Sequence, residues 1–129
     1  MDATSRCVFA RGYKWADKVA AGFTHAASRS GDGLTTLQEI ASFAAQHQMH
    51  WVNLGLPSGY NDSGSIEDKL YRHGHFIGAA SQSQLVQCAG SVAPDADLRT
   101  AEFLGARIAD VASQLAAGRA ILEAFQTTV

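Results

Sequence analysis

The five histidines are the residues of this sequence best suited to chemistry. His47 and His50 stand three residues apart, and His73 and His75 two apart, so either pair has a spacing that suits a metal ion. No HxxxH or HExxH helix pattern accompanies them, and neither cysteine stands at ligand spacing. The sequence therefore predicts surface or helix-end histidines and no metal site.

Nucleophilic catalysis has weaker support. No GxSxG elbow is present, and Ser28 and Ser30 fall in a Ser/Gly-rich segment that turn chemistry explains. Cys88 has no neighbouring cation in the sequence to lower the pKa of its thiol. Neither serine nor cysteine is predicted to act as a nucleophile.

The segment Thr24–Gly33 is the better candidate for a binding site. It follows the apolar run Val19–Thr24, which predicts a strand buried on both faces of a parallel sheet. It precedes a run in which Leu34, Leu37 and Ile40 recur at helical spacing. In open α/β sheets ligands bind at such strand-to-helix loops, where backbone amides and the helix dipole converge. Small residues there let a flat aromatic ligand approach the backbone.

The elements that position this loop can be outlined. The first helix after it starts either at Asp32 or at a Thr36–Glu39 capping box, and ends near 46–48. A second strand is predicted over Met49–Leu56, stopped by Pro57. A surface excursion over 58–74 and a returning strand over His75–Ala80 follow.

The last helix is predicted from Leu98, with Asp97 as its N-cap. Its apolar residues alternate steps of three and four as far as Phe125. A continuous helix of that length would reach about 40 Å, longer than the domain is wide. We expect it to break near Gly118, or residues 116–129 to form an extension that packs on something outside the domain.

Composition limits the class of protein. The 129 residues predict a single domain, and 47% hydrophobic with 17% charged residues is typical of globular proteins. The net charge is −2 and no Lys/Arg run exists, which argues against nucleic-acid binding. No apolar run is long enough to span a bilayer, and the N-terminus is no signal peptide. With only two cysteines, a cytoplasmic location is predicted.

Several segments resemble one family. Trp15–Thr24 (WADKVAAGFT) is similar to the W-x-D/G-K-x-A-A-x-F-T segment of flavodoxin-like FMN-dependent NAD(P)H:quinone oxidoreductases, the tryptophan-repressor-binding-protein group. The segments 46–52 (QHQMHWV) and 78–83 (GAASQS) resemble the family's helix-to-strand step and its C-terminal part. The order holds over roughly Trp15–Leu115.

The resemblance implies an α/β fold with a parallel sheet and flanking helices. It also implies FMN as cofactor, NAD(P)H as electron donor and a small-molecule quinone as acceptor. By position, the flavin-contacting residues would be Thr24, His25, Ala26, Ala27, Ser28, Gly31 and Asp32. His47 matches a histidine that the family places near the flavin, and is the predicted catalytic residue. Gln48 and Ala27 replace glycines common in the family.

The family's first strand and phosphate-holding loop have no counterpart in these 129 residues, so a truncated flavodoxin-like domain with two of five strands is predicted. Its strand at Val19–Phe23 would be an unpaired edge, and one face of the sheet would be bare. We therefore expect a homo-oligomer. The alternative is a catalytically silent paralogue that acts as an oligomeric or partner-binding module.

Overall fold

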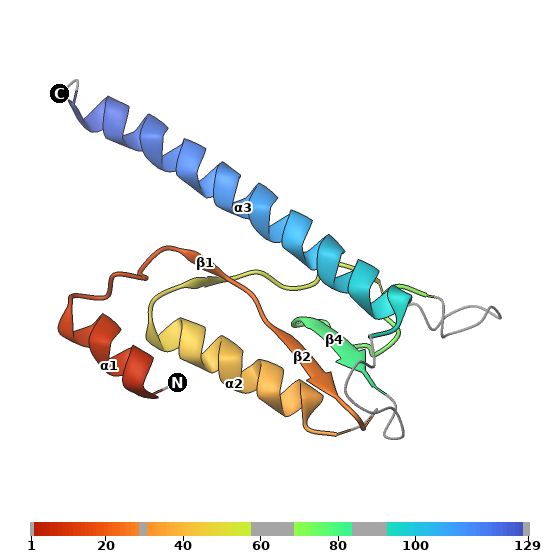
Figure 1. Ribbon diagram of the computed structural model, residues 1–129. Coiled ribbons are helices and arrows are strands. Elements are labelled where there is room, and N and C mark those ends of the chain that lie inside the picture. The colour runs from red at the N-terminus through yellow and green to blue at the C-terminus, as the bar shows by residue number, and fades with distance from the viewer. Residues whose placement is uncertain (1, 29–30, 58–68, 84–92, 128–129) are drawn as a thin grey trace.

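The computed structural model describes residues 2–28, 31–57, 69–83 and 93–127, and it has the predicted α/β architecture (Figure 1). The elements, in chain order, are α1 (Asp2–Ala10), β1 (Val19–Ala20), β2 (Phe23–Ala26), α2 (Gly33–Gln46), β3 (His50–Trp51), β4 (Ala79–Gln82) and α3 (Asp95–Thr127). Every strand pairing among these elements is parallel.

The strands form two parallel pairs that continue one another. β1 pairs with β3, with Val19 opposite His50, and β2 pairs with β4, with Phe23 opposite Ala79. The carbonyls of Lys18, Ala20, Gly22 and Ala26 accept hydrogen bonds from the amides of residues 50, 52, 79 and 83. Because backbone groups alternate between the two edges of a strand, these four acceptors lie on one edge. β3 and β4 therefore lie end to end along the same edge of the segment 19–26. In the sequence they are separated by residues 52–78, which leave the sheet and return to it.

Helices cover both faces of this narrow sheet. On one face, Gly22 lies against Leu37 and Ile40 of α2. On the other, Ala21 and Phe23 share an apolar groove with Leu104 of α3. Figure 1 shows the strands between α3 on one side and α1 with α2 on the other. The prediction of a bare sheet face was wrong, because α3 is long enough to cover the side that α2 leaves open.

The core lies where the excursion returns to the sheet. Leu54, Tyr71, Ala79 and Leu104 form its buried cluster. The Tyr71 hydroxyl has no hydrogen-bond partner among the described atoms, and burial raises its pKa to about 12. Gly78 is required at the return, because a side-chain carbon there would collide with the Gly22 carbonyl oxygen.

The strands depart from their predicted extents. The predicted strand Val19–Thr24 is interrupted at residues 21–22, and β2 runs on to Ala26, into the predicted loop. Of Met49–Leu56 only His50–Trp51 is strand, because the chain leaves the sheet after Val52. β4 overlaps the predicted strand His75–Ala80 only at its last two residues: it starts at Ala79 and runs on to Gln82, whereas Phe76 is 62% exposed. Of the predicted excursion, residues 58–68 lie outside the described part.

α3 also corrects two predictions. It starts at Asp95, so Asp97 is not the N-cap but lies inside the first turn with 3% of its surface exposed. It runs unbroken past Gly118 to Thr127, which at 1.5 Å per residue is about 50 Å. Its far end overshoots the sheet, leaving Leu122 and Phe125 exposed. None of the described helices is long and apolar enough to cross a membrane.

Candidate functional site

The predicted binding loop lies where β2 and β4 end side by side. Thr24, His25 and Ala26 form the last three residues of β2, and Ala27 and Ser28 follow them. After residues 29–30, which lie outside the described part, Gly31 and Asp32 lead into the N-terminus of α2 at Gly33. The structure thus brings these seven predicted residues to the carboxyl end of parallel strands, beside a helix N-terminus.

β4 holds this loop in place from one side. The Gln82 side-chain amide donates to the Ala27 carbonyl at 3.2 Å, and the Ser83 amide donates to the Ala26 carbonyl at 3.1 Å. His25 Nδ1 lies 3.1 Å from the Ser81 hydroxyl in an exposed contact. The backbone of residues 26 and 27 is therefore fixed, while the His25 side chain faces solvent.

The N-terminus of α2 has no side-chain cap. Asp32 occupies the N-cap position without a side-chain cap hydrogen bond, although its carbonyl accepts from the Thr36 amide at 2.8 Å. This start excludes the alternative start at Thr36. Gly33 is buried against the Thr24 methyl and the His75 imidazole. His75 therefore belongs to the neighbourhood of the loop, although the sequence did not place it there.

His75 stacks on a second histidine. The His73 and His75 rings are nearly parallel, with centroids 6.4 Å apart. Burial, and then the positive charge of a protonated His73, lower the pKa of His75 below its ordinary value. The lowered pKa favours the neutral form of His75 beside the N-terminus of α2, where the helix dipole also disfavours a cation.

Asp97 anchors this second loop to α3 and β4. Its carboxylate accepts from Arg72 Nε at 2.6 Å and from Arg72 Nη2 at 2.7 Å. It also lies 3.3 Å from His73 Nε2 and accepts from the Gln82 amide at 3.1 Å. Burial alone would raise the pKa of Asp97, but these hydrogen bonds outweigh it and hold that pKa below its ordinary value. Through Gln82, the carboxylate is linked to the Ala27 carbonyl of the binding loop.

His47 is not part of this arrangement. It lies at the opposite end of α2, which at 14 residues is about 21 Å long. It is fully buried among the rings of Phe9, Trp15 and Phe43, with centroid distances of 4.7 to 5.2 Å, and Nε2 lies 3.1 Å from the Ser5 hydroxyl. In this position His47 packs between α1 and α2 and stabilises their contact. The structure therefore does not bring His47, the predicted catalytic residue, to the binding loop.

The described residues of the loop suit a flat ring. Ala26, Ala27 and Gly31 are small, as close approach of a planar heteroaromatic ligand to the backbone requires. Among the seven predicted residues, the only full charge is the carboxylate of Asp32; Arg29 belongs to the same loop but lies outside the described part. Within the described residues of the loop, the donors for a phosphate are backbone amides, hydroxyls and His25.

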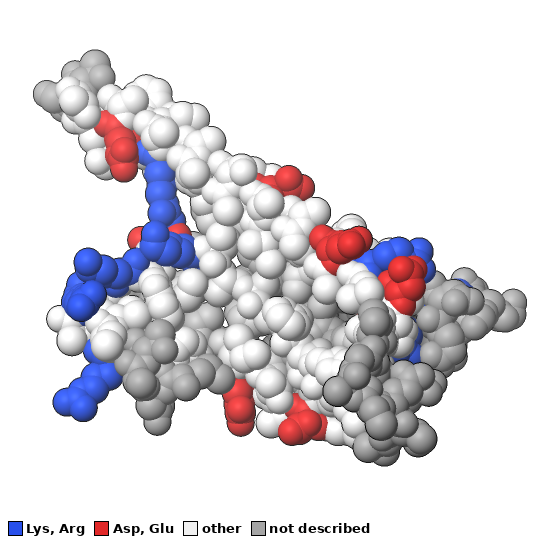
Figure 2. Space-filling view, viewed as in Figure 1, with Lys and Arg blue, Asp and Glu red and all other residues white. Residues whose placement is uncertain are grey.

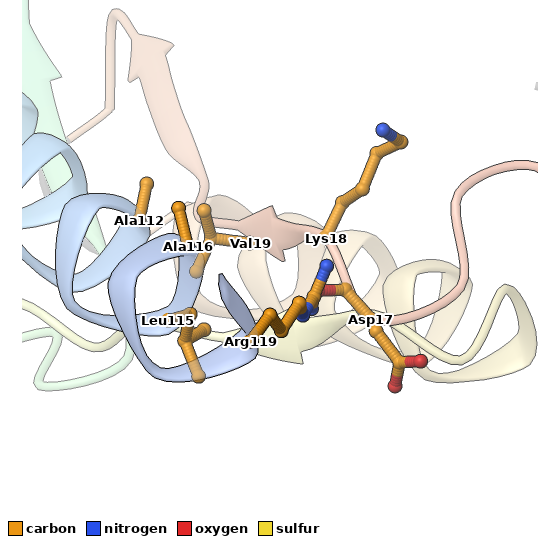
Figure 3. Close-up of a pocket in the computed structure, with 7 residues that line it drawn as sticks. All are labelled: Asp17, Lys18, Val19, Ala112, Leu115, Ala116 and Arg119. Atoms are coloured by element: carbon orange, nitrogen blue, oxygen red, sulfur yellow. The ribbon is translucent and has the colours of Figure 1, made fainter. Parts of the chain in front are cut away.

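A separate hollow lies at the other end of the sheet (Figure 3). It measures about 300 Å³ and is lined by Asp17, Lys18, Val19, Ala112, Leu115, Ala116 and Arg119. Figure 3 shows Arg119 reaching from α3 toward Asp17, whose carbonyl accepts its hydrogen bond. Because Arg119 is engaged there and Lys18 points away, the hollow presents mainly small apolar side chains.

Comparison with known proteins agrees with the geometry. Over 114 residues the chain is 40% identical to Flavodoxin FldP of Pseudomonas aeruginosa (strain UCBPP-PA14). The chain has a flavodoxin-like α/β fold. The alignment covers 88% of this chain and 60% of that relative, so the chain spans about three fifths of the relative's length. No protein-family model and no solved structure matches the chain.

This similarity refines the sequence interpretation. The truncated flavodoxin-like α/β fold is confirmed. The relative is named a flavodoxin, so membership of the quinone-reductase group stays a prediction. His75, Gln82 and Asp97 are the site neighbours that sequence reasoning missed. The sequence carries no local signal for this pair, because Arg72 and Asp97 stand 25 residues apart and only their shared burial shows that each charge needs the other.

Proposed function

We propose that this chain is a flavin-binding redox domain that holds the isoalloxazine ring of FMN at the β2–α2 loop. The single observation that supports this most is the loop itself. Small residues follow the carboxyl end of a parallel strand, their backbone is fixed by Gln82, and they lead into an uncapped helix N-terminus. The similarity to a flavodoxin over most of the chain agrees with this choice of ligand.

The contacts suggest how the loop would serve a flavin. The backbone of Ala26 and Ala27, held by β4, would face the ring, and His75 would close the site from the α2 side. When bound, FMN would supply the electron-transfer chemistry, while the protein orients the ring and limits its contact with water. His47 is left out of this proposal because helix α2 separates it from the loop.

The finer proposal keeps NAD(P)H as electron donor and a quinone as acceptor, in a cytoplasmic protein. The family resemblance of Trp15–Thr24 and residues 78–83 supports it. It predicts NAD(P)H oxidation that depends on both added FMN and a benzoquinone. A flavodoxin that exchanges electrons only with proteins would bind FMN and show no such turnover.

The alternative is a catalytically silent module that binds a partner or itself. Ala27, which replaces a glycine common in the family, favours it, because its methyl group narrows the approach of a flavin ring to the backbone.

A paired substitution distinguishes these functions. Ala27→Trp would fill the loop, whereas Ala117→Trp adds the same side chain to an exposed position of α3. We expect Ala27→Trp to weaken FMN binding at least tenfold, as measured by quenching of flavin fluorescence, and Ala117→Trp to leave it unchanged. Equal affinity in both variants would place the flavin elsewhere.

A further inference from the structure

The last residue of β4 holds the binding loop from outside the strand ladder. Ala26 lies opposite Gln82 in the parallel pair, and its carbonyl accepts from the Ser83 amide at 3.1 Å. Successive carbonyls of an extended strand point to opposite edges, so a continued strand would turn the Ala27 carbonyl away from β4. The Gln82 side-chain amide instead holds that carbonyl on the β4 side, at 3.2 Å. The peptide between Ala27 and Ser28 is therefore turned out of the strand pattern, and β2 ends at Ala26.

The turned peptide sets the direction of one amide. A trans peptide is planar, and its carbonyl and N–H point in opposite directions. The described residues contain no cis peptide bond. Because the Ala27 carbonyl points toward the Gln82 side chain, the Ser28 N–H points away from it. Among the described residues the Ser28 amide donates to no other group, so Gln82 presents a backbone donor that has a fixed direction and no described protein acceptor.

Gln82 is itself anchored on both sides. On one side its strand pairs with β2, and on the other its backbone amide donates to Asp97 Oδ2 at 3.1 Å. Asp97 is in turn held by its buried ion pair with Arg72. The Gln82 side chain thus reaches Ala27 from a fixed origin. A group that is held in this way needs little further ordering when a ligand arrives.

A neutral acceptor is the best partner for the Ser28 amide. Along the lower margin of the molecule, where α2 runs in Figure 1, Figure 2 shows acidic and no basic side chains among the described residues. Arg29, the next residue of the loop, lies outside the described part. The described acidic side chains would repel a phosphate, whereas a carbonyl oxygen or ring nitrogen of a flat heteroaromatic ligand can accept the hydrogen bond. A flavin carries such acceptors on the pyrimidine half of its ring.

We propose that Gln82 is a positioning residue for the flavin ring: by holding the Ala27 carbonyl, it aims the Ser28 N–H at an acceptor on the pyrimidine half. This role rests on the proposed function, which places the ring at the β2–α2 loop. Reduction of a flavin raises the electron density on those acceptors, and a hydrogen bond strengthens as its acceptor gains negative charge. Gln82 therefore stabilises bound flavin in both redox states, and the reduced state more.

The test compares two identical substitutions. Gln82→Met keeps the length of the side chain and removes its N–H donor, and Gln114→Met makes the same change at an exposed position of α3. We expect Gln82→Met to weaken binding of oxidised FMN and of riboflavin equally, by about fivefold, because both share the ring. Binding of the reduced flavin should weaken a further tenfold, which lowers the midpoint potential of the bound flavin by about 30 mV. Gln114→Met should leave affinity and potential unchanged.

A second variant separates positioning from a general loosening of the loop. In Gln82→Glu the new carboxyl can donate to the Ala27 carbonyl only when it is protonated, and the neighbouring carbonyl raises its pKa. The ratio of its flavin affinity to that of the unmodified chain should therefore rise at least threefold from pH 8 to pH 5. The ratio cancels the titration of His75 and Asp97, which both proteins share.

The outcomes distinguish this role from the proposed function. Flavin binding by the unmodified chain with an unchanged potential in Gln82→Met and a ratio independent of pH in Gln82→Glu would overturn the role of Gln82 alone. A weakening confined to FMN would overturn it as well, because the donor would then serve the phosphate. No binding of either flavin by the unmodified chain would overturn the proposed function, and the role of Gln82 with it.

Discussion

Asp97 and Arg72 form a buried bidentate pair, with both carboxylate oxygens within 2.7 Å of the guanidinium nitrogens and about 3% of either residue exposed. The pair joins the turn after the excursion to the first turn of α3. Because Asp97 also accepts from the Gln82 amide, it reaches the binding loop through the Gln82 side chain.

Asp97→Asn should destabilise the fold strongly. The substitution removes the carboxylate from this buried ion pair, and breaking a buried pair typically costs about 3 kcal/mol or more. Asp95→Asn is the matched control, because Asp95 is exposed and pairs with Arg99 on the helix surface, where a pair contributes at most about 1 kcal/mol. Urea unfolding measures both. Equal unfolding midpoints for the two variants would show that the buried pair does not hold the fold.

Stability should fall as the pH drops from 7 toward 5, because of His75. Its pKa is lower in the folded protein than in the unfolded chain, so the unfolded chain takes up the proton first. Stability is thus complete above the unfolded pKa of about 6.5 and decreases as the pH falls through it. His75→Gln should flatten this slope, as measured by urea midpoints between pH 5 and 8, whereas the exposed His25→Gln should retain it. An unchanged slope in His75→Gln would show that the pH dependence of stability in this range does not come from His75.

The contribution of Asp97 to stability should change in a lower pH range. Its folded pKa lies below its unfolded value, so its contribution is present above pH about 4 and is lost as the pH falls through the folded pKa. His75→Gln should therefore still lose stability and unfold below about pH 4. Asp97→Asn, which has no carboxylate to protonate at this position, should not show that further loss of stability. Far-ultraviolet circular dichroism against pH separates the two ranges.

His47→Ala should loosen α1 and leave flavin binding intact. Removing a fully buried ring that contacts three aromatic side chains should cost about 2 kcal/mol or more, while His50→Ala, at an exposed position, should change stability by less than about 0.5 kcal/mol. Limited proteolysis near residues 11–14 should become faster only in His47→Ala. A loss of FMN affinity with unchanged stability would instead support the catalytic role implied by the family resemblance.

Much of the architecture follows from local patterns. The spacing of Leu37, Ile40 and Ala44 predicts α2, because these residues meet the sheet once per turn. The small residues after Phe23 indicate the loop. In contrast, no local pattern predicts that β3 and β4 both pair with the segment 19–26. That arrangement depends on where the chain comes back to the sheet after residues 52–78, which is fixed by the contact of Gly78 with Gly22. No local pattern shows such a long-range contact.

The same distinction applies to the site. Asp97 has the residue type and position of an N-cap, and only its burial beside Arg72 reveals another role. His47 matches a family histidine by position, yet its surroundings are set by α1, which packs on it from 42 residues away along the chain. The surroundings of both side chains depend on elements distant in the sequence, which no local pattern shows; the N-cap prediction for Asp97 was wrong, and the catalytic role of His47 stays a prediction.

Arg29 is the only Lys or Arg within the loop Thr24–Gly33, and it is not among the seven predicted flavin contacts. If those seven residues hold the ring and no side chain binds the phosphate, riboflavin and FMN should bind with affinities within about threefold, since a charge-assisted phosphate contact would contribute about 1.5 kcal/mol or more. Fluorescence titration with both flavins measures this. FMN binding tighter than riboflavin by tenfold or more would require a phosphate partner outside the seven residues, such as Arg29.

The central claim, that this chain binds flavin at the β2–α2 loop, is tested most directly by thermal unfolding with and without excess FMN. A ligand at a hundred times its Kd stabilises the folded state by about 2.7 kcal/mol, which gives a rise of several degrees in Tm. We predict such a rise, together with quenched flavin fluorescence at one flavin per chain. An unchanged Tm and unquenched fluorescence at 1 mM FMN would contradict the claim and favour the silent module.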